Sequence, residues 1–362
     1  MIRHGLFIGK FYPPHIGHHS AIRAAAAQCD RLTVLAMAAA VETVPLADRM
    51  AWLTAEHRHE PNVLVAGIHC DAPVDITERT VWAAQVAAMR AGLRAAGAPT
   101  EVDAVFCGDD YGPALAQWLG AANVPIVRTD VNATSIRHDL AGHWDWLAPH
   151  TRAGMTTRVV VVGAESTGTT TISTHLAQHY RRIWPTTRWV PEYGREYTAE
   201  KWRRHPGVPI TEIPWSTDDF DHVAAEQSRR EEAAAASGSP VLICDTDAFA
   251  TGIWERRYLG EQARTDQHWT DVAPRGVYLL TDHVDVPWQD DGMREGELAV
   301  RAAMTNWFAD ALTAAGHSWV LLTGTVEQRI SLATRTIDQL LTLRSTFGQP
   351  LSGPGFGRTP CR

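Results

Sequence analysis

The chain has 362 residues, of which 45% are hydrophobic and 20% charged, a composition typical of a soluble globular protein with two domains. Its 33 basic and 41 acidic side chains give a formal net charge of -8, which argues against a nucleic-acid partner. No apolar run approaches the ~20 residues that cross a bilayer, and no signal peptide is visible, so we expect no membrane partner and a cytoplasmic protein. The five scattered cysteines suit reduced thiols.

The first part of the chain alternates apolar, strand-like runs with Ala-rich segments of helical spacing. The strand-like runs cover residues 5–9, 32–37, 63–68, 102–108 and 124–128. Alternation of this kind predicts a parallel sheet with helices on both faces, which is a doubly wound α/β domain. We place this domain at residues 1–150.

A second alternation follows the short polar segment 151–157, which has no periodicity and which we interpret as a linker. Its strand-like runs cover residues 158–163, 188–192, 240–247, 275–282 and 318–324. The pattern predicts a second doubly wound domain at 158–345. The two parts share no motif, which argues against an internal duplication. The Gly- and Pro-rich residues 346–362 are expected to form a disordered tail.

The sequence GKFYPPHIGHH, at 9–19, stands where the first strand ends and a helix begins. Its histidines His15 and His18 lie three residues apart, beside the free amides of the predicted helix start. Two imidazoles in that position can hydrogen-bond the negative charge that a nucleotidyl transfer builds on a triphosphate. Gly17 lets the backbone come close to a ligand. The motif therefore predicts a nucleotide site.

The sequence GAESTGTTT, at 163–171, follows four consecutive valines and precedes a segment with helical spacing. A phosphate-binding loop reads Gly, four free positions, Gly, Lys, then Ser or Thr. Gly163, Gly168 and Thr170 fit this pattern, whereas Thr169 stands where the lysine belongs. Taken alone, the match is defective.

Three later segments supply the charged groups that accompany such a loop. PEYGREYTAEKW begins after the next strand, and CDTDAFAT ends an apolar strand with Asp245 and Asp247, as a Walker B strand does. WQDDGMRE then places Asp291 and Arg294 in a short polar turn. Nucleoside and nucleotide kinases use a loop, strand-end acids and a later arginine in this order.

The pattern GKFYPPHIGH is that of the HxGH nucleotidyltransferase superfamily, and it resembles the nicotinamide mononucleotide adenylyltransferase domain of NadR-type bifunctional proteins. PLADRMAWL at 45–53, GDDYG at 108–112 and VNATSIR at 131–137 resemble other stretches of that domain; VNATSIR has Val131 and Asn132 where the family has Ile and Ser. The resemblance implies transfer of AMP from ATP to nicotinamide mononucleotide, giving NAD and pyrophosphate, with Mg²⁺ bridging the phosphates.

The same resemblance implies roles for individual residues. His15 and His18 would hold the triphosphate, and Lys10 and Arg137 would neutralise it. The other residues that it places at ATP are Gly9, Phe11, Gly17 and Thr134. Those that it places at the second substrate are Arg49, Trp52 and Tyr111. For Arg49 and Trp52, a packing pair on one helix face is the open alternative.

The loop at 163–171, EYGREY, DTD and DDGMR resemble the ribosylnicotinamide kinase domain of the same proteins, which phosphorylates nicotinamide riboside with ATP. By this resemblance the loop would cradle the ATP phosphates, Thr170 would bind Mg²⁺, and Asp245 would help to hold the metal. The loop residues concerned are Gly163, Ala164, Glu165, Ser166, Thr167, Gly168, Thr169 and Thr170. Glu192 or Asp247 would be the base for the 5′-hydroxyl.

Further charged residues would complete this second site. Arg195 or Arg294 would steady the transferred phosphoryl group, and Asp291 would contact the substrate. The resemblance spans about residues 1–345. The helix-turn-helix of the DNA-binding members has no counterpart in the sequence, so we expect no DNA-binding role. The sequence is compatible with a homo-oligomer.

Thr169 leaves two interpretations of the second domain open. Either Arg195, Lys201 or Arg294 supplies the missing positive charge, or the domain is a nucleotide sensor with weak or no kinase activity. For the first domain, the HxGH motif alone also allows nucleotide transfer to another phosphate ester.

Overall fold

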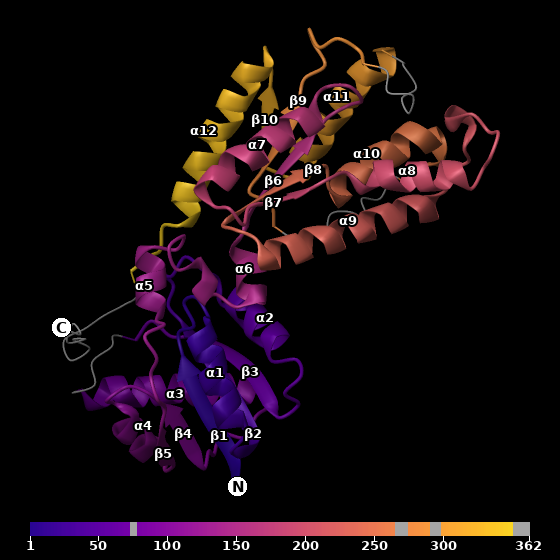
Figure 1. Ribbon diagram of the computed structural model, residues 1–362. Helices are drawn as coiled ribbons and strands as arrows, with labels where there is room; N and C mark the ends of the chain where they lie inside the picture. The colour runs from indigo at the N-terminus through magenta and orange to yellow at the C-terminus, as the bar shows by residue number, and fades with distance from the viewer. Residues whose placement is uncertain (73–77, 265–273, 290–297, 350–362) are drawn as a thin grey trace. The chain divides into compact units, whose positions relative to one another are not determined.

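The computed structural model describes residues 1–72, 78–264, 274–289 and 298–349. The chain divides into two compact units, Met1–Gly154 together with Ser345–Arg362, and Met155–Arg344. Each unit is built on a parallel sheet that carries helices (Figure 1), so the prediction of two doubly wound α/β domains is confirmed. Within the described ranges, no helix is long and apolar enough to cross a membrane.

The sheet of the first unit has the strand order β3-β2-β1-β4-β5. Its strands are β1 (Ile2–Gly9), β2 (Cys29–Ala38), β3 (Val63–His69), β4 (Ala104–Cys107) and β5 (Ala122–Pro125). The order reverses between β1 and β4, and ligands bind at the carboxyl ends of strands beside such a switch. Strand β5 ends before the predicted residues 126–128, because its pairing with β4 ends at Cys107 and Pro125. Val127 is 89% exposed.

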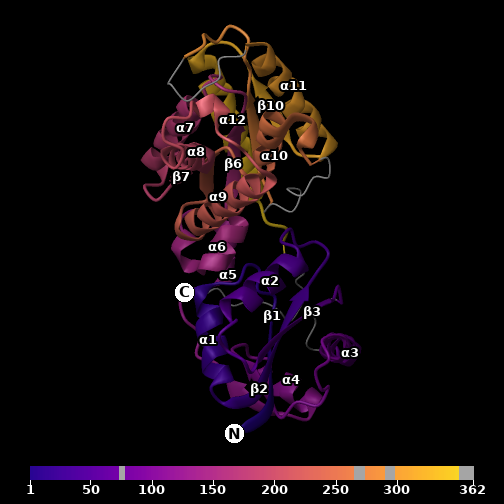
Figure 2. The same ribbon diagram turned by 90° about the vertical axis from the view of Figure 1, so that its right-hand side faces the viewer.

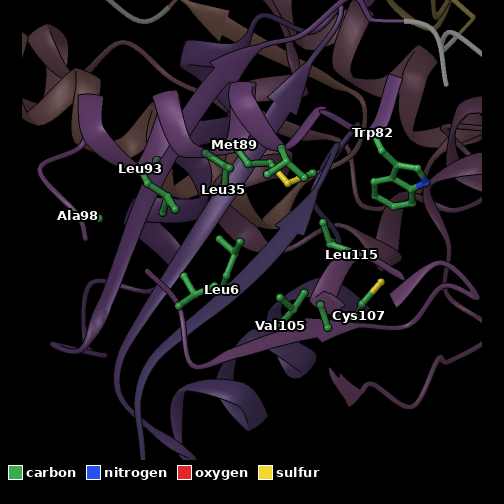
Figure 3. Close-up of a cluster of buried hydrophobic side chains, with 13 residues drawn as sticks. Leu6, Leu35, Trp82, Met89, Leu93, Ala98, Val105, Cys107 and Leu115 are labelled. Carbon is green, nitrogen blue, oxygen red and sulfur yellow. The ribbon is translucent and has the colours of Figure 1, made fainter. Parts of the chain in front are cut away.

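Helices cover both faces of this sheet, and Figure 2 shows α1 and α3 on opposite sides of it. The helices are α1 (Ile16–Ala26), α2 (Leu46–Glu56), α3 (Arg79–Ala95), α4 (Gly112–Leu119), α5 (Ala133–His138) and α6 (Pro149–Met155). Strand side chains alternate between the faces. Leu6 packs in a cluster with Met89 of α3 (Figure 3), whereas Phe7 packs with Ile22 of α1. Burial on both faces explains the continuous apolar runs of the sequence.

The sheet of the second unit has the order β10-β9-β6-β8-β7. Its strands are β6 (Thr157–Val162), β7 (Arg188–Val190), β8 (Val241–Asp245), β9 (Val277–Thr281) and β10 (Trp319–Leu322). Its helices are α7 (Thr169–Ile183), α8 (Tyr193–Arg203), α9 (Thr217–Ser237), α10 (Ala248–Leu259), α11 (Leu298–Ala314) and α12 (Val326–Arg344). Helices α7 and α12 pack together over the core that contains Val159 and Val161. The loop after central strand β6 therefore starts beside the end of β8.

The predicted linker at 151–157 is not irregular, because it contains the end of α6 and the first residue of β6. The first residues of the predicted tail also have a defined place in the first unit. The Tyr12 hydroxyl donates to the Gly348 carbonyl at 3.1 Å, and the Phe347 ring lies edge-on to Tyr12. A Cβ on Gly348 would lie 2.0 Å from the Val41 carbonyl oxygen, so only glycine fits there. Residues 350–362 lie outside the described residues.

Candidate active sites

The two histidines of the HxGH motif are in contact at the turn between β1 and α1. His15 is the N-cap of α1, and its Nδ1 accepts a hydrogen bond from the His18 N–H at 3.3 Å. The two rings stack with centroids 3.6 Å apart. A Cβ on Gly17 would lie 2.9 Å from Thr129 Oγ1, so this glycine lets the loop after β5 approach the turn. The structure thus brings together the residues that the sequence predicted.

Burial keeps these imidazoles neutral. His15 is 5% exposed, and burial lowers its pKa from 6.5 to about 4. Burial also lowers the pKa of His18 well below its usual value, and the charges of His15, His19 and Arg128 add to the effect. Because His15 Nδ1 accepts a hydrogen bond, its proton sits on Nε2, which can donate to a phosphate oxygen. Among the described residues, the buried Nδ1 of His18 has no hydrogen-bond partner.

Arg137, Thr134 and Lys10 reach the same turn. Arg137 donates to the Tyr12 carbonyl at 2.7 Å and to Thr134 Oγ1 at 3.2 Å, so it holds the turn in place. Lys10 pairs with Glu42 at 2.6 Å, while its side chain stays 40% exposed. This lysine therefore has a carboxylate partner before any nucleotide binds.

Sequence reasoning missed Arg128, which follows β5. Its side chain is 59% exposed, is ion-paired with Asp109, and lies close enough to His18 to lower the pKa of that imidazole. The one available signal was its place just after a strand, at the carboxyl edge of the sheet. Asn132, which stands where the family has serine, caps α5 by accepting from the Ser135 N–H at 2.9 Å.

The surroundings of Arg49 favour the packing alternative over the predicted role as a substrate ligand. Arg49 is fully buried, its Nη1 donates to Glu42 at 2.6 Å and its Nε to the Val44 carbonyl at 2.9 Å. It therefore anchors the loop that follows β2. Trp52 lies against Gly154, where a Cβ would fall 2.1 Å from its Nε1, and so it packs within the unit. Tyr111, the third predicted ligand, packs edge-on against Trp82 with centroids 6.2 Å apart.

The glycine-rich loop of the second unit has the backbone of an anion-binding nest. Ser166 and Gly168 have φ values of 60° and 92°, and α7 begins at the next residue. Successive amides in this conformation converge on an anion at a helix N-terminus. The predicted loop residues that line the adjacent pocket are Gly163, Ala164, Glu165, Ser166, Thr169 and Thr170. The side chain of Thr167 points inward instead, and its hydroxyl donates to the Ala164 carbonyl at 2.7 Å.

Thr170 and Asp245 form the predicted metal-ligating pair. The Thr170 hydroxyl donates to Asp245 Oδ2 at 2.6 Å, across the gap between α7 and the end of β8. Burial raises the pKa of Asp245, whereas the hydroxyls of Thr170 and Thr169 and the charge of Arg195 oppose that rise. Two oxygen donors fit Mg²⁺, which takes few protein ligands and completes its shell with water and phosphates.

Glu192 and Asp247, the two candidate bases, have different surroundings. Glu192 lines the pocket at the start of α8. Asp247 is fully buried, and its Oδ2 accepts from the Tyr278 hydroxyl at 2.7 Å and from Arg275 Nε at 3.1 Å. Thr246, with a φ of 68°, turns the chain away, so Asp247 caps α10 by accepting from the Ala250 N–H. These contacts give Asp247 a structural role, and its role as the base stays a prediction.

The candidate replacements for the loop lysine also differ in position. Arg195 lines the pocket. Lys201 instead pairs with Asp219 at 2.5 Å, and both side chains are 11% exposed. Lys201 is not among the residues that line this pocket, and its role as the missing charge stays a prediction. Asp291 and Arg294 lie outside the described residues.

Aromatic rings, which sequence reasoning did not assign to this site, form one wall of the pocket. The residues are Trp215, Phe220, Trp254 and Tyr258. Trp215 stacks with Tyr258 at 5.0 Å and with Phe220 at 5.3 Å between centroids. A flat aromatic ring can be held by such a wall while polar atoms at the other end face the loop.

Residues 158–329 match the family model of an AAA domain. The trifunctional NAD biosynthesis/regulator protein NadR of Salmonella typhimurium is 25% identical over 328 residues, which are 85% of this chain and 76% of that protein. NadR of Escherichia coli is 24% identical over 80% of this chain and 71% of its own.

The chain is therefore similar to NadR over most of its length. Two crystal structures of NadR proteins also share its fold. One, in complex with NR, has a TM-score of 0.59, 17% identity, and covers 94% of this chain and 96% of that one. The other, in complex with NAD and AMP-PNP, has a TM-score of 0.58 and 18% identity. The relation to NadR supports an enzyme of NAD metabolism.

Proposed function

We propose that the first unit transfers AMP from ATP to nicotinamide mononucleotide, giving NAD and pyrophosphate. The observation that carries this proposal is the stacked, neutral pair of His15 and His18 at the start of α1. The Nε2 proton of His15, the His18 imidazole and the helix amides would supply hydrogen bonds for the triphosphate. Attack by the substrate phosphate on the α-phosphorus then needs no covalent enzyme intermediate.

The test of the first proposal is NAD formation from nicotinamide mononucleotide and MgATP. The expected product appears with pyrophosphate, and His18→Ala lowers the rate about 10²- to 10³-fold, as loss of a transition-state hydrogen bond does. An unchanged rate in His18→Ala, or a preference for a different phosphate ester, would overturn it. The Leu93→Val variant, in the buried core of the same unit, serves as the packing control.

We propose that the second unit phosphorylates the 5′-hydroxyl of nicotinamide riboside with ATP. The carrying observation is one pocket that holds Thr170, Glu192 and the aromatic wall together. The wall would take the nicotinamide ring, and the loop amides would hold the phosphates. Glu192 would accept the hydroxyl proton as the oxygen attacks the γ-phosphorus, and Arg195 would stabilise the charge on the transferred group. Thr170 and Asp245 would hold Mg²⁺, which would supply neutralisation of the phosphate charge.

The second proposal is tested by ADP release that depends on nicotinamide riboside. Release of ADP distinguishes this reaction from the first, which releases pyrophosphate. We expect Thr170→Ala to abolish ADP release while leaving NAD formation from the mononucleotide intact.

Thr169 favours one other function for the second unit, that of a nucleotide sensor. A sensor would bind MgATP without any ADP release in the presence of the riboside. Measurable transfer by the wild-type chain would remove this alternative.

A further inference from the structure

Two buried arginines lie beneath the phosphate-binding loop. Arg301 of α11 is 6% exposed, and its Nη2 donates to the Ser166 carbonyl at 3.0 Å. Arg329 of α12 is 2% exposed, and its Nη1 donates to the Thr167 carbonyl at 3.2 Å. Both guanidinium groups therefore bind consecutive carbonyls of the same loop, from the side that faces the interior.

The carbonyl contacts determine where the loop amides point. A trans peptide group directs its C=O and its N–H to opposite sides. Because the Thr167 carbonyl faces Arg329, the N–H of Gly168 points away from Arg329. A cation at the carbonyl end polarises the peptide group and makes its amide hydrogen a stronger donor. Arg329 thus adds to the positive potential that the N-terminus of α7 already has.

The charge of Arg329 is poorly balanced within the fold. Besides Thr167, its N–H groups donate to the carbonyls of Gly324 at 2.9 Å and Asp282 at 3.0 Å. Its buried Nη2 has no hydrogen-bond partner among the described residues. Burial lowers its pKa, and the charge of Asp282 opposes that effect. Arginine nonetheless stays protonated in proteins. Because the hydrogen-bond partners of Arg329 are neutral carbonyls, the negative charge of a polyphosphate on the loop would stabilise this buried cation.

We propose that Arg329, assisted by Arg301, supplies from beneath the loop the positive charge that Thr169 does not. The proposal rests on the proposed nucleotide-binding function of the second unit. Both arginines are positioning residues. Arg329 acts on the phosphates through the peptide group that joins Thr167 to Gly168. The Thr167 N–H donates to the Ala164 carbonyl at 3.4 Å, so Arg301, bound to the Ser166 carbonyl, acts through the charge that it places beneath the loop. The charge of a P-loop lysine is thereby moved from the pocket side of the loop to its inner side.

The test is a double-mutant cycle between Arg329→Gln and Thr169→Lys in the full chain, because only coupled residues give non-additive effects. The readout is the dissociation constant of MgADP by calorimetry, with the Thr170→Ala chain reporting any binding to the first unit. We expect Arg329→Gln to weaken MgADP binding about tenfold, which is reasonable for a charge several Å away at intermediate dielectric. In the Thr169→Lys background the loss should fall below about twofold, because the lysine restores the charge.

Arg158→Gln is the matched control. Arg158 is 2% exposed, pairs with Glu232 at 2.7 Å, and lies at the other end of β6 from the loop. It should leave MgADP binding unchanged. Unaltered binding in Arg329→Gln, or equal losses with and without Thr169→Lys, would overturn the proposal, and so would an equal loss in Arg158→Gln.

Arg301→Gln provides a second cycle in case Arg329→Gln does not fold. Arg301→Gln should weaken MgADP binding in the wild-type chain and should have much less effect in the Thr169→Lys background. Equal losses of MgADP affinity in the two backgrounds would contradict the proposal. MgADP binding does not require turnover. Coupling without ADP release from the riboside would therefore reject the kinase function and keep this inference.

Discussion

Asp247→Asn tests whether the buried aspartate is structural rather than catalytic. The substitution keeps the shape of the side chain but removes the charge that Arg275 Nε contacts at 3.1 Å. Breaking a buried ion pair costs about 3–5 kcal/mol. Arg275 also pairs with Glu231 at 2.8 Å, so we expect a loss near the lower end, about 3 kcal/mol of unfolding free energy.

Glu192→Gln is the matched variant with the opposite expectation. Glu192 is half-buried at the start of α8. Glutamine keeps the size of the side chain and its capacity to hydrogen-bond, so the replacement should cost about 1 kcal/mol of unfolding free energy or less, well below the cost of Asp247→Asn. Loss of a general base should lower the rate of riboside-dependent ADP release by about 10²- to 10⁴-fold.

Both variants are compared by urea unfolding of the full chain and by ADP release per folded molecule. The structure predicts that Asp247→Asn loses stability and keeps turnover within a few-fold, whereas Glu192→Gln loses turnover and keeps stability. If Asp247→Asn kept its unfolding free energy but no longer released ADP with the riboside, this reasoning would be refuted, because Asp247 would then be the catalytic proton acceptor.

Three other predictions concern binding and stability. Trp215→Ala should raise the KM for nicotinamide riboside about tenfold, equivalent to roughly 1.4 kcal/mol of lost stacking and burial, and leave the KM for ATP unchanged in the ADP assay. Lowering the pH from 7 to 4 should reduce the unfolding free energy by on the order of 3 kcal/mol through His15, because the unfolded imidazole protonates near 6.5 and the folded one only near 4. His15→Gln should flatten that dependence, and an equally steep curve would contradict it. Gly348→Ala should destabilise the first unit by about 1 kcal/mol in urea unfolding, because its Cβ would meet the Val41 carbonyl; equal stability would show that this contact is dispensable.

The fold and the central residues of each site could be predicted because their signals are local. Alternating apolar runs indicate parallel strands. The spacing of residues within one short turn identifies His15 and His18, and in the same way it identifies Thr170 in its loop. Asp245 was predictable because a strand end places its side chain at the carboxyl edge of the sheet. These inferences need no knowledge of distant contacts.

The remaining assignments depended on contacts between distant segments. The contact of Arg49 with Glu42, and the turn at Thr246 that directs Asp247 inward, join residues whose partners the sequence alone does not reveal. The aromatic wall joins Trp215 to Tyr258 of a later helix, and Arg329 lies 160 residues beyond Thr169. No spacing rule within one element predicts such pairs.

The most direct test of the account supplies the full chain with nicotinamide riboside and MgATP and follows nucleotides by chromatography. We predict ADP first, then NAD with pyrophosphate, with His18→Ala stopping at the mononucleotide and Thr170→Ala forming NAD only when the mononucleotide is supplied. Absence of NAD from both the riboside and the mononucleotide would contradict the central claim that the two units catalyse successive steps.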